Sequence, residues 1–254
     1  MSTSVIVSKP PVNQIENSPV RKKLLEYPSL VRLFSRGPNL PTLLGVASTP
    51  VYLGLSPGVY YDSEFRMPGK PPYDEPATPE QVDWLRRAGV THVLSFIPLD
   101  PTAWPATLVW AGFDPFLNYA WARRETIYLY ELNGGRGRIS WSPPAAESRA
   151  EIRDYKAHRV EVQTESTSGG QLVLTDLAYS GWTVAVDGRP VAGLVVDHMY
   201  RAVDVPPGNH TVVWSYQPDS LVLGSGISLA TLLVLAAIAH IRFWHPTWTA
   251  RAGF

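Results

Sequence analysis

The sequence LVLGSGISLATLLVLAAIAHI, residues 221–241, decides the architecture of this chain. It contains no Asp, Glu, Lys or Arg, and eleven of its residues are Leu, Ile or Val. As a helix it would be about 31 Å long, close to the thickness of the hydrocarbon core of a bilayer. A buried core helix is the alternative, but such helices are usually shorter and keep a polar stripe. We therefore expect a transmembrane helix over residues 220–242 and the lipid bilayer as a partner.

Small residues occupy the first half of this span. Gly226 and Ala230 form a small-xxx-small pair, a pattern that lets two membrane helices approach closely. The alternative is that Gly and Ser are simply common in membrane helices. The pair predicts packing against other transmembrane helices.

Positive charges around the span predict its orientation. Arg242 and Arg251 follow it, whereas residues 202–220 contain no Lys or Arg. The positive-inside rule places the tail, 243–254, in the cytoplasm and the preceding bulk outside a cell membrane that this chain crosses once. The first residues, MSTSVIVSKPPVNQ, do not resemble a signal peptide. Two arrangements remain open: the chain is the last part of a longer polytopic protein, which the charges favour, or it is tail-anchored with its bulk in the cytoplasm.

Composition limits the function classes. The 254 residues have a net charge of zero, and 45% of them are hydrophobic, which is enough for a core. Without excess or clustered positive charge, nucleic acid is not expected as a partner. Because the chain has no cysteine, disulfides, thiolate metal sites and a cysteine nucleophile are excluded.

Residues 1–142 combine helix and strand signals, so we expect a small αβ region outside the membrane. Ser18 and Pro19 predict a helix start, and Thr78, Pro79 and Gln81 form a capping box that begins a second helix. Gly89 suits a left-handed cap after that helix. We expect strands at 91–97, 127–132 and 139–141, a short strand at 30–34, irregular structure at 37–61, a loop at 66–76, and an aromatic, loop-rich segment at 98–118.

Residues 143–154 are expected to be a linker, and 155–219 an antiparallel β-sandwich. Turn residues such as Asp187-Gly188 separate its strands. The six predicted strands are 159–164, 171–176, 183–186, 191–196, 200–205 and 211–216. The predicted fold class is thus α+β: a small αβ region, then an antiparallel β-sandwich and one C-terminal transmembrane helix.

No catalytic motif is present. The carboxylates stand singly, and the six histidines lack the HxH or HxxxH spacing of a metal site. The glycine-rich run 134–137 lies between two strands, so no helix N-terminus is there to hold a phosphate. We expect no catalytic residue, no metal and no cofactor, although carboxylates distant in sequence could meet in space and make the region a hydrolase.

Two segments carry a specific resemblance: LVLTDLAYSGWTVAVDGRPV, residues 172–191, and YRAVDVPPGNHTVVWSYQPDSLVLGSGIS, residues 200–228. Their order of motifs resembles the C-terminal end of YfhO-like bacterial membrane proteins, which belong to the GT-C class of glycosyltransferases. The matching positions are Tyr179, Gly181, Trp182, Asp187, Gly188, Arg201, Ala202, Gly208, His210, Tyr216 and Pro218. Segments 84–95 and 127–141 also look similar to the family.

The resemblance implies an extracytoplasmic domain and the last helix of a transferase that uses a polyprenyl-phosphate-linked sugar. The family's catalytic residue in the first outer loop has no counterpart here, so we expect a split or truncated accessory chain that is not catalytic alone. It would engage a glycan or a lipid-linked acceptor, with Trp182, Asp187, Tyr200 and Arg201 as candidate contacts. The alternative is a single-pass surface protein whose sandwich binds a carbohydrate or a protein.

Overall fold

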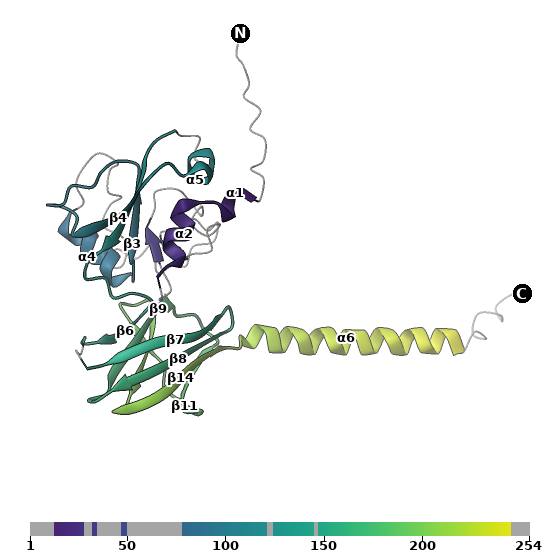
Figure 1. The fold of residues 1–254 in the computed structure, drawn as a ribbon. Coiled ribbons are helices and arrows are strands. Elements are labelled where there is room, and N and C mark those ends of the chain that lie inside the picture. Colours follow the sequence, from purple (N-terminus) through teal and green to yellow (C-terminus); the bar gives the residue numbers. More distant parts are fainter. Residues whose placement is uncertain are drawn as a thin grey trace, which may run out of the picture.

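A computed structural model describes residues 13–27, 32–34, 47–49, 78–120, 124–144 and 147–244. It consists of an αβ region, a β-sandwich of two sheets, and a long helix that projects away from both (Figure 1). The predicted α+β fold class is confirmed. The structure therefore has one apolar helix of membrane length among the described residues.

The helices of the αβ region begin where the capping residues predict. In α2 (Pro19–Leu25), the Ser18 hydroxyl accepts a hydrogen bond from the Arg21 amide at 3.1 Å. In α4 (Pro79–Arg87), Thr78 and Gln81 form the predicted capping box. Two further short helices are α1 (Asn13–Glu16) and α5 (Pro115–Ala120).

A five-stranded sheet forms the rest of the αβ region, in the order β2-β1-β3-β5-β4. β1 pairs in parallel with β2 and β3, whereas β5 runs antiparallel to β3 and β4. The bounds are β1 (Arg32–Phe34), β2 (Ala47–Thr49), β3 (His92–Ser95), β4 (Ala106–Gly112) and β5 (Ile127–Leu132). The strands predicted at 91–97 and 127–132 are confirmed.

The prediction of loops over 98–118 is wrong where β4 and α5 form. β4 is an edge strand with a register shift between Leu108 and Trp110, and Leu108 is half exposed. A bulge breaks the alternation of apolar and polar residues by which a strand is normally recognised. The sequence pattern therefore hides this strand.

The sandwich consists of a five-stranded sheet, β11-β10-β14-β8-β7, and a four-stranded sheet, β12-β13-β9-β6, all antiparallel. The bounds are β6 (Ile139–Ser142), β7 (Arg149–Lys156), β8 (Arg159–Ser166), β9 (Gly170–Leu177), β10 (Trp182–Val186), β11 (Arg189–Val191), β12 (Leu194–Val196), β13 (Tyr200–Val205) and β14 (Gly208–Tyr216).

The four-stranded sheet is covered on both faces. Leu172 and Leu174 of β9 pack in the sandwich core, whereas Val173, between them, packs with Leu85 and other residues of the αβ region. Tyr200 of β13 belongs to the same shared core. A strand buried on both sides needs a continuous apolar run, which explains the sequence of β9. The αβ region and the sandwich therefore share one hydrophobic interface.

Three expectations about the sandwich are wrong. The predicted linker, 143–154, contains most of β7, whose Ala150 and Ile152 pack against the core while its charged residues face outward, as an edge strand permits. The single strand predicted at 191–196 is two strands, β11 and β12, in different sheets. β6, which we expected in the αβ region, pairs with β9 and so belongs to the sandwich.

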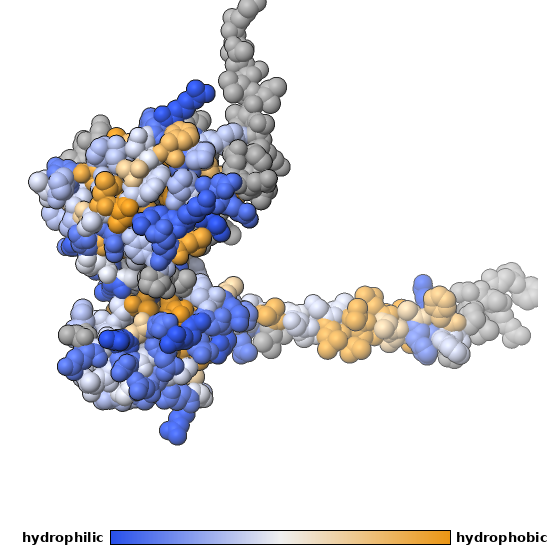
Figure 2. Space-filling view, viewed as in Figure 1, coloured by the Kyte–Doolittle hydropathy of each residue, from blue (hydrophilic) through white to orange (hydrophobic). Residues whose placement is uncertain are grey.

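The helix α6 (Asp219–Trp244) follows β14 after only two residues. Its 26 residues correspond to about 39 Å, longer than the hydrocarbon core of a bilayer. None of its most apolar window is buried in the protein, and Figure 2 shows hydrophobic residues along its surface. This excludes the alternative of a buried core helix. Residues 28–31, 35–46, 50–77 and 245–254 lie outside the described residues, and so do the predictions made for them.

Candidate functional site

The four candidate contact residues lie in two separate places. Trp182 begins β10, and Tyr200 and Arg201 begin β13, near the start of α6. Asp187 lies at the other end of β10, about 17 Å along the strand from Trp182 at the usual rise per residue. The structure therefore brings Trp182 and Arg201 together and leaves Asp187 apart.

Trp182 and Arg201 are in direct contact. The guanidinium carbon of Arg201 lies 3.7 Å from the centroid of the Trp182 ring, a cation–π arrangement. The same ring lies 5.2 Å from that of Tyr216, the last residue of β14. Trp182 is half-buried, whereas Tyr200 and Arg201 are only 6% exposed. Trp182 and Tyr216 thus offer the accessible aromatic surface of this group.

Asp187 makes a different set of contacts in the hairpin between β10 and β11. Its backbone φ is +50° and that of Gly188 is +77°, as a type I′ turn requires. One carboxylate oxygen lies 2.6 Å from Nδ1 of His210, and the other accepts a hydrogen bond from the Thr211 amide at 2.8 Å. His210 Nε2 lies 3.1 Å from the Pro207 carbonyl oxygen. These contacts hold the turn between β10 and β11 against the turn that precedes β14.

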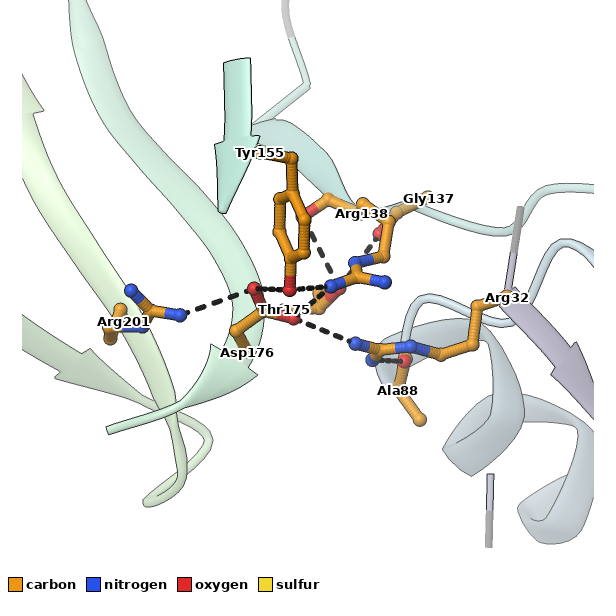
Figure 3. A network of polar contacts seen from close by, with 8 residues as sticks. All are labelled: Arg32, Ala88, Gly137, Arg138, Tyr155, Thr175, Asp176 and Arg201. Atoms are coloured by element: carbon orange, nitrogen blue, oxygen red, sulfur yellow. Dashed lines mark hydrogen bonds and ion pairs between the residues drawn. The ribbon is translucent and has the colours of Figure 1, made fainter. Parts of the chain in front are cut away.

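Sequence reasoning missed a cluster of charges around Asp176, near the end of β9 (Figure 3). Oδ1 of Asp176 accepts hydrogen bonds from Arg138 at 2.7 Å and Arg32 at 3.1 Å. Oδ2 accepts from the Tyr155 hydroxyl at 2.8 Å and from Arg201 at 3.2 Å. We call Asp176 with these four partners the Asp176 cluster.

The three arginines of the Asp176 cluster are buried, Tyr155 is partly exposed, and the cluster joins both regions of the protein. The exposed fractions of Arg32, Arg138 and Arg201 are 9%, 8% and 6%. Arg32 comes from β1 of the αβ region and also donates to the Ala88 carbonyl at the end of α4, whereas the other members belong to the sandwich. The cluster is therefore a polar centre inside the interface between the two regions.

Burial changes the acid–base properties of two members. Loss of solvation lowers the pKa of the Arg201 guanidinium below its ordinary value, although the charge of Asp176 opposes this. Burial also raises the pKa of the Tyr155 hydroxyl, and the negative charge of Asp176 adds to the effect. Tyr155 therefore stays a neutral hydrogen-bond donor at physiological pH.

The backbone comes close to itself beside this cluster. Gly89, after α4, has a φ of +71°, which confirms the predicted left-handed cap. A Cβ at Gly89 would lie 2.4 Å from both the Gly137 carbonyl oxygen and the Thr175 hydroxyl oxygen. Thr175 in turn donates to the Gly137 carbonyl at 3.1 Å. Glycine is therefore needed here for two reasons, its conformation and its lack of a side chain.

No sequence signal points to the Asp176 cluster. Its members are spread from residue 32 to residue 201, without a fixed spacing, and each taken alone resembles a surface charge. For metals, the described residues contain no group of three His, Cys, Asp or Glu side chains that could hold an ion. The arrangement is suited to binding charge and to fixing the two regions together.

Comparisons with known proteins bear on the sandwich and the start of α6. Residues 143–228 match the family model described as bacterial membrane protein YfhO. No curated protein and no solved structure matches the chain. The match covers both segments that carry the resemblance, and it does not include the segments before residue 143. Residues 143–228 of this chain are therefore a YfhO-like membrane-protein region.

Proposed function

We propose that this chain is the extracytoplasmic accessory part and a membrane helix of a YfhO-like membrane glycosyltransferase. It is not catalytic by itself, and it engages a glycan or a lipid-linked sugar acceptor beside the membrane. The observation that carries this proposal is the family match over 143–228, which covers the sandwich from β7 onward and extends into α6.

The short connection between sandwich and helix supports a role at the membrane surface. Only Gln217 and Pro218 separate β14 from α6, and the Gln217 amide donates to the Gly181 carbonyl at 2.8 Å. The sandwich is thus held next to the first turn of the helix. With Arg242 at the far end of α6, the positive-inside rule favours an outer sandwich and a cytoplasmic C-terminus.

Trp182 is the residue that we propose for contact with sugar. Aromatic rings bind the apolar faces of sugars, and Trp182 is partly exposed near the membrane end of the sandwich. Tyr200 is buried in the shared core, so its contribution is to support this surface from below. Asp187 would contact only a second part of an extended glycan, since it lies at the opposite end of β10.

Binding by the full chain in nanodiscs tests the proposal. The probes are a glycan array and a polyprenyl-phosphate-linked hexose added to the nanodisc lipid. We expect the Trp182→Ala variant to lose binding, because it removes the ring that a sugar would stack on. Leu108→Ala, which changes a half-exposed apolar residue in the αβ region, is the matched control and keeps binding. Binding of a protein but of no glycan would favour the surface-protein alternative and contradict the proposal.

Packing of α6 against other membrane helices belongs to the same proposal. Among the described residues, no atom outside the helix would lie within 4 Å of a Cβ at Gly226, which leaves room on this face for a second helix. Small residues permit such close approach between backbones. Replacement of Gly226 and Ala230 by Leu should then reduce crosslinking to a partner helix.

A further inference from the structure

Aromatic side chains gather at the end of the sandwich from which α6 emerges. Tyr179, in the turn between β9 and β10, is 49% exposed, and Trp182 and Tyr216 are partly exposed. The Trp182 amide donates to the Tyr179 carbonyl at 3.4 Å, which closes the turn. A Cβ at Gly181, inside this turn, would lie 3.2 Å from Cε2 of Tyr216. We call Tyr179, Trp182 and Tyr216 the aromatic tip.

The aromatic tip is held against the start of α6. The Gln217 amide donates to the Gly181 carbonyl at 2.8 Å, and a Cβ at Gly181 would lie 2.9 Å from the Pro218 Cα. The Pro218 carbonyl accepts a hydrogen bond from the Leu221 amide at 2.9 Å, as in a helical turn. The position of the tip relative to the bilayer is therefore set by the position of α6.

The depth of the aromatic tip follows from the apolar span. Asp219 is the last Asp, Glu, Lys or Arg before Arg242, so the hydrocarbon core begins after Asp219, near Leu221. At the helical rise per residue, Pro218 lies about 5 Å outside Leu221. The head-group layer is about 5–8 Å thick on each side of a bilayer. The turn that contacts Pro218 therefore lies at the level of the lipid head groups.

The residue types of the tip suit this layer. Trp and Tyr are enriched at membrane interfaces, because their rings are apolar and each ring carries a polar group that stays hydrated. The chain around the tip, residues 177–186 and 211–218, contains no Asp, Glu, Lys or Arg. No charged group of these segments would therefore lose its hydration when the rings contact lipid.

We propose that the aromatic tip inserts into the lipid head-group layer and that the exposed ring of Tyr179 anchors it there. The partner is the bilayer that α6 crosses. A second point of insertion fixes the tilt of the sandwich on the membrane, which a single helix does not fix. Sugar contact by Trp182 assigns no role to Tyr179, so this proposal goes beyond the proposed function and does not depend on glycan binding.

Spin labels on the full chain in nanodiscs measure the depth of the tip. Because the chain has no cysteine, a single introduced cysteine is labelled alone. Ser180→Cys is exposed beside Tyr179, and Asn209→Cys is exposed about 23 Å from Tyr216 along β14. Oxygen concentrates in lipid, whereas a nickel complex stays in water. We expect the ratio of oxygen to nickel collisions to be several-fold higher at Ser180→Cys than at Asn209→Cys.

A label at Leu223→Cys in α6 verifies that the helix is inserted. If this label lies in lipid while the label at Ser180→Cys collides with both reagents as the label at Asn209→Cys does, the proposal is overturned. Shielding of the Ser180→Cys label from both reagents would mean that a protein surface, such as a second copy of the chain, covers the tip. That result also overturns insertion into lipid.

Tyr179→Ser, added to the Ser180→Cys chain, tests the anchoring ring itself. We expect the collision ratio to fall toward the value at Asn209→Cys. Leu108→Ser removes an apolar side chain of nearly equal exposure, 50%, from the αβ region and should leave the ratio unchanged. An unchanged ratio in Tyr179→Ser would show that Tyr179 is not the anchor. Glycan binding by a chain whose Ser180→Cys label lies in water would contradict this proposal and leave the proposed function intact.

Discussion

The αβ region and the sandwich differ in how their strands pair. In the sandwich, β7 pairs with β8 and β10 with β11, both across short turns, and the family model matches this region. In the αβ region, β1 pairs in parallel with β3, which lies about sixty residues later in the chain. Local turns leave a strong sequence signal, whereas parallel pairing depends on connections that leave little. The comparison shows why the turns of the sandwich were predicted from the sequence, whereas the architecture of the αβ region was predicted only in part.

The Asp176 cluster connects these two regions, although the sequence pattern of neither region indicates it. Its arginine from β1 and its partners from the sandwich meet over the hydrophobic surface that the regions share. If this interface is strong, the two regions should unfold together. The following predictions test that, from the largest expected effect to the smallest.

Loss of the shared carboxylate should have the largest effect. Asp176→Asn leaves the arginines buried without their negative charge, and breaking a buried ion pair costs about 3–5 kcal/mol. Chemical denaturation followed by tryptophan fluorescence should show both regions unfolding together at lower denaturant. The control Asp154→Asn changes a more exposed aspartate and should cause a far smaller loss. Separate transitions with an unchanged sandwich would mean that the cluster does not couple the regions.

Gly89→Ala should weaken the contact between the regions through sterics alone. We expect a loss of about 2–5 kcal/mol, from left-handed backbone strain together with overpacking against Gly137 and Thr175. Gly188→Ala is a matched control, since its φ is also positive but a Cβ there would meet no atom of the described part of the chain within 4 Å. Its cost should be the backbone strain alone, about 1–2 kcal/mol. Equal losses of stability in the two variants, measured by thermal unfolding, would show that the close approach of the backbone at Gly89 does not contribute.

The contact between His210 and Asp187 should have a small effect that depends on pH and is confined to the sandwich. The hydrogen bond to Asp187 raises the pKa of His210 above 6.5, so this stabilisation is complete below 6.5 and is lost as pH rises through the raised pKa. The same bond lowers the pKa of Asp187 below 3.8, so its stabilisation is present above 3.8 and lost as pH falls through the lowered pKa.

The pair therefore contributes most between about pH 4 and 6.5. The difference in unfolding midpoint between the natural chain and His210→Gln should be larger at pH 5.5 than at pH 9. Thr183→Val, which changes an exposed hydroxyl of β10, should show the same difference at both pH values. A His210→Gln effect independent of pH would mean that the charge of His210 is not involved.

Prediction from sequence succeeded where the signal is local. The caps at Ser18 and Thr78, the left-handed Gly89 and the turn at Asp187 depend on neighbouring residues and are confirmed. β7 was missed because it is an edge strand with few apolar residues, and β4 was missed because it contains a bulge. At the candidate site, the contact of Trp182 with Arg201 joins residues that were both named, but Asp176, which holds Arg201, was not.

The sequence alone determined the long apolar helix, the turns of the sandwich and the resemblance of the sandwich to YfhO-like proteins. Each of these features depends on residues that are consecutive in the chain. Tertiary structure decided that β9 is covered on both faces and that arginines from residues 32, 138 and 201 meet at one carboxylate. Such convergence arises when sheets pack against one another. Residues far apart in the chain then share a buried volume in which unpaired charge is costly.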